Sequence, residues 1–404
     1  MNLSPTNQLA IILLLFSQIV LSQPLDVLKT DTMDANNTYP RYTFMEVRGH
    51  YGQFLPTNEI LANSVAQNPW YAFDIRFGWK GYGRKKWHSS YAYPSYGLGW
   101  FSCYFNPRDN VVGNPNAFYA WYNQPIVSIG FFSINAELDF GISYDFYPYD
   151  SISNPSQTVI GSKYNVFFNP GLESTFSLSA RIDFSVGVNF VHYSNGRMRT
   201  PQRGMNLAGL SGKLRYNFRP YTKRHNVQRD LPIRPVNIDH GKMKIPMRWE
   251  LAMHLSSSYA TAKHYTELKN THFWISTLGV DVARHYTYFS KIALGLDLFY
   301  DGSIVEDYYI IDGIEFEDVN EGEKFVFGAH FGHEFMIYRW SIVMQLGTNL
   351  NQRDYKGIWF ARVGLRYDLT RNIFLRVSLK TQDKFQADFV EWGGGLSLYK
   401  IKKQ

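Results

Sequence analysis

Short segments in which apolar and polar residues alternate are the sequence feature that most restricts the fold. In residues 291–300, 358–368 and 373–380 every second side chain is apolar, and Asp, Arg or Lys occupies positions in between. Side chains of a β-strand point alternately to its two faces, so each segment predicts a strand with one apolar and one charged face. An apolar outside around a charged inside is the pattern of a transmembrane β-barrel; the alternation also fits a soluble barrel with its apolar face inward.

The composition and the shortness of the apolar runs favour a transmembrane barrel over a soluble one. Aromatic residues make up 17% of the 404 residues, and such residues are common in strands. After residue 21 no run approaches the ~20 apolar residues of a transmembrane helix. The net charge of +7 is modest and favours a solubility feature, with an acidic partner such as nucleic acid or anionic lipid as the alternative. Cys103 is the only cysteine, which excludes an intrachain disulfide and a cysteine-based metal site.

The N-terminus predicts export. Leu9 to Leu21 is mostly apolar and precedes Ser22-Gln23-Pro24, which indicates a secretory signal peptide over residues 1–22, although Lys and Arg are missing before the run. A run of about 13 residues is too short to span a bilayer. Residues 23–40 would form a leader segment. We therefore expect a protein of the Gram-negative outer membrane.

Residues 41–404 are predicted to form one closed antiparallel, all-β transmembrane barrel of about 14 to 16 strands, with 12 as a lower alternative. Tight turns and longer loops alternate along the C-terminal half, as short periplasmic turns and longer external loops do in bacterial barrels. The long, basic segment 219–245 falls on the side of the short turns and breaks this alternation. It indicates a segment inside the lumen or the periplasm, or a miscounted strand.

One predicted strand ends in side chains suited to ester chemistry. In 182–194 the even-numbered residues are apolar up to Phe190, and His192 and Ser194 continue the same face. The alternation in 205–218 places Asn206 on that face of the next strand. Residues two apart on a strand lie about 6–7 Å apart, within reach of an imidazole and a hydroxyl. A serine beside a histidine is a nucleophile for acyl transfer, but the same residues also fit a strand leaving the apolar layer.

The segment His192-Tyr193-Ser194-Asn195, followed by Pro201, Gly204 and a hairpin strand, resembles the lipid A 3-O-deacylase family of PagL-like outer-membrane esterases. It is most similar to the longer acyloxyacyl hydrolases of Bacteroidetes-type bacteria. The resemblance covers about residues 190–218, and the segments 49–52 and 94–99 are similar less specifically. The known family barrel is much smaller than this chain.

The resemblance implies that Ser194 is the nucleophile and His192 the general base. The substrate would be lipid A or lipopolysaccharide in the outer leaflet, and the chemistry needs no cofactor. The acidic triad position of the family falls on Asn206, whose amide orients an imidazole but stabilises the imidazolium less than a carboxylate does. The oxyanion-hole asparagine of the family falls on Gln202.

Further side chains near this segment complete the predicted site. Asn195 and Gly204 are candidates for the oxyanion hole or for positioning. Arginine binds phosphate well, and lipid A carries phosphates in many bacteria. The candidates for this contact are Arg197, Arg199 and Arg203.

A non-enzymatic barrel is the main alternative, acting as a channel or as a scaffold that binds lipids or anions. Its lumen would be lined by Arg215, Arg362, Arg366 and Arg376. A soluble secreted β-protein is the third possibility. The segment His330-Phe331-Gly332-His333-Glu334 resembles a zinc-protease motif, but such motifs need a helix. On a strand the two histidines point to opposite faces, so we predict no metal site.

Overall fold

The computed structural model describes most of the chain after residue 41. The described residues are 42–55, 68–81, 88, 91–105, 111–157, 159–196, 198–199, 204–218, 248–261, 272–287, 290–304, 320–337, 339–352, 356–383 and 386–401. The predicted signal peptide, the leader segment and the segment 219–245 lie outside these residues.

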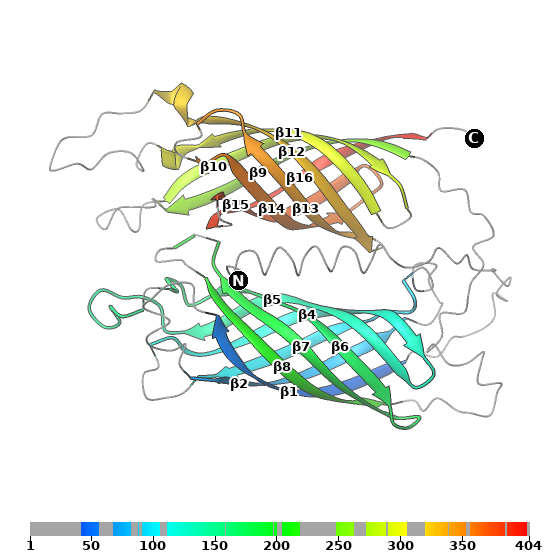
Figure 1. Cartoon of the computed structure of the whole chain (residues 1–404). Helices are drawn as coiled ribbons and strands as arrows, with labels where there is room; N and C mark the ends of the chain where they lie inside the picture. Colours follow the sequence, from blue (N-terminus) through cyan, green and yellow to red (C-terminus); the bar gives the residue numbers. More distant parts are fainter. Residues whose placement is uncertain are drawn as a thin grey trace, which may run out of the picture. The chain divides into compact units, whose positions relative to one another are not determined.

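The described residues form two closed antiparallel barrels of eight strands each (Figure 1). The first barrel consists of β1 (Thr43–Leu55), β2 (Trp70–Lys80), β3 (Ser95–Tyr104), β4 (Gly113–Ile129), β5 (Phe132–Phe146), β6 (Asn165–Ser177), β7 (Ile182–Ser194) and β8 (Met205–Asn217). The second consists of β9 (Arg248–Thr261), β10 (His272–His285), β11 (Ser290–Asp301), β12 (Phe325–Ile337), β13 (Trp340–Asn349), β14 (Trp359–Asp368), β15 (Ile373–Gln382) and β16 (Gln386–Ile401). Two short 3-10 helices, η3 (Gly302–Ile304) and η4 (Glu321–Lys324), lie between β11 and β12.

Each barrel closes because its first and last strands pair. In the first barrel β1 pairs with β8 from Phe44↔Asn217 onwards. In the second, β9 pairs with β16. Every neighbouring pair is antiparallel, so backbone donors and acceptors of the strands are satisfied within each barrel.

Both barrels expose apolar residues and bury charged ones. On the outer faces Leu210, Leu294 and Leu398 are each more than 60% exposed, whereas Arg76 and Arg362 are fully buried in the two interiors. A soluble protein shows the opposite distribution, because burying a charge is costly and large exposed apolar surfaces are rare. The arrangement is that of membrane-spanning barrels, which confirms the predicted all-β antiparallel transmembrane fold.

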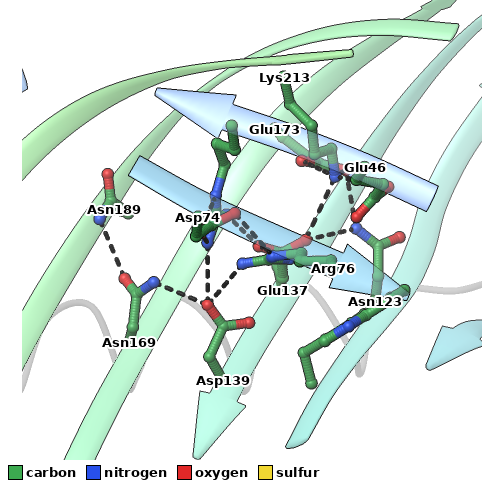
Figure 2. A network of polar contacts seen from close by, with 12 residues as sticks. Glu46, Asp74, Arg76, Asn123, Glu137, Asp139, Asn169, Glu173, Asn189 and Lys213 are labelled. Atoms are coloured by element: carbon green, nitrogen blue, oxygen red, sulfur yellow. Dashed lines mark hydrogen bonds and ion pairs between the residues drawn. The ribbon is translucent and has the colours of Figure 1, made fainter. Parts of the chain in front are cut away.

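The interior of the first barrel is filled by a network of ion pairs (Figure 2). Arg76 contacts Glu137 at 2.8 Å and Asp139 at 2.7 Å. Arg48 contacts the same two carboxylates and also Asp74, at 2.8 Å. Lys213, Arg215, Glu46 and Glu173 extend the network. An eight-stranded barrel is just wide enough for its own side chains, and these fill it with mutually neutralising charges.

The second interior is filled in the same way by different residues. Arg362 contacts Asp297 at 3.2 Å, and His330 lies 2.7 Å from Asp297 through Nδ1 and 2.7 Å from Asp281 through Nε2. His333 lies on the outer face, where its Nε2 contacts the hydroxyl of Tyr286. His330 and His333 therefore lie on opposite faces of β12.

The prediction of one barrel over 41–404 is wrong, although the sixteen strands agree with the predicted 14 to 16. Eight strands are enough to close a barrel whose interior is occupied by its own side chains. The segment 117–148 contains most of β4 and β5 of this first barrel. The anomalous segment 219–245 falls in the connection between β8 and β9, where one barrel ends and the next begins. The predicted common lumen is wrong for the same reason. Arg215 belongs to the first barrel, and Arg362, Arg366 and Arg376 belong to the second.

Candidate active site

The hairpin formed by β7 and β8 brings His192 and Asn206 together. The two residues are direct partners in the register of the antiparallel pair. Their neighbours on the same face are lipid-side residues, since Val188 and Leu210 are exposed and paired with each other. Side chains directly opposite one another on an antiparallel pair lie close enough to interact. His192 and Asn206 therefore meet on the outer surface of the first barrel.

A short hydrogen bond joins the two side chains and sets the state of the imidazole. Nδ1 of His192 lies 2.6 Å from Oδ1 of Asn206. An amide oxygen only accepts, so Nδ1 carries the proton and donates it to Asn206. In the neutral ring Nε2 is then the acceptor, which is the state that a general base needs.

Ser194 lies on the same face of β7, two residues beyond His192, and pairs with Val166 of β6. Tyr193 points inward between them, where its fully buried ring packs against Phe146 and Phe167. This inward anchor fixes the end of the strand, and the alternation of the strand then directs His192 and Ser194 outward.

Asn195 directly follows β7 and is held by a residue from a distant loop. Its Nδ2 donates to Oγ of Ser162, at 2.8 Å, and Ser162 belongs to the segment 147–164 between β5 and β6. The sequence did not point to Ser162, because the contact depends on how a separate loop folds. An isolated serine in a polar loop gives no signal of it.

Gly204 lies against the edge of the His192 ring. Its φ is +70°, and a Cβ built there would be 3.0 Å from Cε1 and 3.8 Å from Nε2 of His192. A side chain at this position would meet both an unfavourable backbone conformation and the ring. The glycine therefore leaves the reactive edge of the imidazole open.

Gly204→Ala is expected to lower activity more than stability. The left-handed backbone costs roughly 1–2 kcal/mol for alanine, while the new methyl group displaces the ring from its partner. If His192 acts as a general base, kcat should fall by about tenfold, since small misplacements of such a group have large effects. Gly130→Ala is the matched control, because Gly130 has a similar φ of +61° and open space around its Cβ. Equal activity of both variants would contradict this role of Gly204.

Three predicted residues lie outside the described part of the chain: Arg197, Gln202 and Arg203. Arg199 is described and exposed, in the same 195–204 loop. The described site thus consists of His192, Ser194, Asn195 and Asn206, with Gly204 and Ser162 against it.

Two inside-out barrels with this cluster on an outer face define a membrane-type double β-barrel protein. Residues 247–403 match the family described as "Acyloxyacyl hydrolase, C-terminal domain". The second barrel is therefore similar to this acyloxyacyl hydrolase family, and the match supports the predicted PagL-like resemblance. The match covers the second barrel, whereas the cluster on which the prediction rested lies on the first. No curated protein matches the chain significantly.

Solved structures of membrane barrels are similar to the chain only weakly. The crystal structure of the outer membrane enzyme PagL is 17% identical, with 42% of this chain and 97% of PagL covered and a TM-score of 0.30. A mutant porin of Rh. blastica is 9% identical over 88% of this chain and 100% of the porin, with a TM-score of 0.19. A deletion mutant of the TodX monoaromatic hydrocarbon channel is 8% identical over 90% and 91%, with a TM-score of 0.19. Scores this low say nothing about function.

Proposed function

We propose that the protein is an outer-membrane serine esterase that removes an ester-linked acyl chain from lipid A. The observation that carries the proposal is the 2.6 Å contact between His192 Nδ1 and Asn206 Oδ1, with Ser194 on the same outward face. A nucleophile, a base and a residue that orients the base are the parts of a serine hydrolase site. They belong to the outer face of β7 and β8, the side on which an acylated glycolipid of the outer leaflet would lie, and Ser194 itself is buried at 5% exposure.

The proposed reaction uses these groups in turn. Oγ of Ser194 attacks the ester carbonyl while Nε2 of His192 takes the hydroxyl proton. The imidazolium then returns that proton to the departing alcohol oxygen, which leaves an acyl-serine and a free hydroxyl on lipid A. Water, activated by the same imidazole, hydrolyses the acyl-serine and releases a fatty acid. Asn195, next to the nucleophile, would donate a hydrogen bond to the oxyanion that forms in both steps.

The hydrogen bond between the carboxamide of Asn206 and the imidazole of His192 predicts how Asn206 variants behave. Asn206→Ala removes the partner of Nδ1, so we expect kcat to fall on the order of 100-fold, less than the loss of an aspartate from a triad. Asn206→Asp retains an acceptor and adds a charge that stabilises the imidazolium, so we expect kcat to rise by about tenfold. Release of fatty acid from lipid A in detergent measures both. An alanine variant as active as the wild type would show that Asn206 does not orient His192.

Mass spectrometry of lipid A from cells tests the proposed function as a whole. Lipid A from cells that make the wild type should lose the mass of one acyl chain, whereas cells that make Ser194→Ala should keep it. The two proteins must reach the membrane folded and in equal amounts, which the heat-modifiability and the band intensities on gels of the membrane fraction show. Equal acylation in both strains would contradict the proposed function.

The interiors argue against a channel. Arg215 donates to Glu46 at 2.7 Å, Arg362 contacts Asp297, and Arg366 contacts Glu250 at 2.9 Å. Among the described residues these three arginines are neutralised by carboxylates of their own barrel, which does not favour an interior that conducts or binds anions. The residues of the proposed esterase site lie on the outer face of the first barrel instead.

A further inference from the structure

The loop between β5 and β6 reaches the candidate site through one side chain. Ser162 accepts a hydrogen bond from Nδ2 of Asn195 at 2.8 Å. The two residues are far apart in the chain, and Asn195 directly follows Ser194. A contact of this kind fixes a side chain beside the nucleophile from outside the catalytic hairpin.

Ser162 is itself held in one orientation. Its Oγ lies 2.9 Å from the carbonyl oxygen of Tyr164 and 3.0 Å from Oδ1 of Asn165. Both neighbours only accept, so the single hydroxyl proton is directed to them. The lone pairs of the hydroxyl then face Asn195. Asn165 closes the ring of contacts by donating its Nδ2 to the carbonyl of Ser162, at 3.0 Å.

The loop that carries Ser162 is anchored to the barrel. The amide of Tyr149 donates to the carbonyl of Ile160, at 2.9 Å. Val159 and Ile160 are buried in the apolar cluster of the first barrel. On the other side of Ser162, the hydroxyl of Ser143 in β5 donates to the carbonyl of Asn165, at 3.0 Å. The position of Ser162 is therefore fixed by contacts between its loop and the barrel on both sides.

We propose that Ser162 is a positioning residue that aims the amide of Asn195 at the oxyanion of the reaction, an inference that rests on the proposed esterase function. One proton on Nδ2 of Asn195 is donated to Ser162, which restrains the rotation of the amide. The direction of the second proton is thereby restrained as well. Donors that are oriented before the reaction stabilise a developing oxyanion without reorganisation.

Kinetics of purified variants on lipid A test the inference. Ser162→Ala should lower kcat by about tenfold and change KM by less than about twofold, since a misdirected donor costs less than the 10²–10³-fold loss of a removed one. Ser162→Thr keeps the hydroxyl and should restore kcat to near the wild-type value. Ser151→Ala is the matched control, because Ser151 is an exposed serine in the same loop.

A double-variant comparison separates positioning from a general effect on the loop. If Ser162 acts through Asn195, Ser162→Ala should cause no further loss in an Asn195→Ala background. An equal loss in both backgrounds would overturn the inference, as would full activity of Ser162→Ala beside an inactive Ser194→Ala. In both of these cases the proposed function would stand. An inactive wild type would instead overturn the proposed function.

The side-chain amide signal of Asn195 gives a readout that does not depend on activity. In the ¹⁵N spectrum of the protein in micelles, this signal is assigned by its loss in Asn195→Ala. Ser162→Ala should shift or broaden it, and Ser162→Thr should leave it near its original position. An unchanged signal in Ser162→Ala would overturn the inference.

Discussion

Ser194→Ala is expected to abolish release of fatty acid from lipid A, with kcat lower by at least about 10³-fold, because removal of a nucleophile from a serine hydrolase leaves only binding and oxyanion stabilisation. The physical basis is the placement of Ser194 and His192 on one outward face of β7, with the imidazole held by Asn206. Purified protein in detergent, lipid A as substrate and mass spectrometry of the released acid measure this loss.

The control for this variant is Ser185→Ala. Ser185 lies on the same strand but faces the interior, where its hydroxyl contacts Thr175 at 2.8 Å. It should retain wild-type activity. His192→Ala should be as inactive as Ser194→Ala, and the double variant should be no worse, because nucleophile and base act as a unit. Additive losses would contradict the account of a coupled pair.

Arg76→Met is expected to lower the free energy of unfolding of the first barrel by about 3–5 kcal/mol. Arg76 is fully buried and contacts Asp74, Glu137 and Asp139. Methionine fills much of the same space but leaves these carboxylates with one cation fewer. Breaking a buried ion pair costs far more than the net value of the pair, because a charge remains without compensation.

Urea titration of the barrel in lipid vesicles, followed by tryptophan fluorescence, measures this change. The control is Arg181→Met, since Arg181 lies in the exposed turn between β6 and β7 and contacts the hydroxyl of Tyr216 at 3.1 Å. The control should change the unfolding free energy by less than about 0.5 kcal/mol. Equal midpoints for Arg76→Met and the wild type would contradict the account of the filled lumen.

The strands could be predicted because a strand with two unlike faces leaves a period of two in the sequence. Alternation placed 182–194 and 205–218 close to β7 and β8, and it assigned His192 and Asn206 to one face. Closure into two barrels could not be predicted in this way. The alternation of apolar and polar residues is the same in a barrel of eight strands and in one of sixteen. In the sequence, only the anomalous segment 219–245 indicated the boundary between the two barrels.

The local part of the candidate site was predictable for the same reason. His192, Ser194 and Asn206 lie on two strands of one hairpin, so their proximity follows from register alone. The role of Gly204 needed coordinates, because its φ of +70° and its distance to the ring decide it. Ser162 was not predictable, since its contact with Asn195 is a meeting of two loops that no periodicity describes.

Covalent labelling of Ser194 tests the central claim most directly. A fluorophosphonate reacts with a serine only where a neighbouring base activates the hydroxyl, and it leaves a stable adduct that peptide mass spectrometry locates. We predict one adduct on Ser194 in the wild type, slowed by lipid A, and none in His192→Ala. Deacylation of lipid A by a protein whose Ser194 takes up no label would contradict the account.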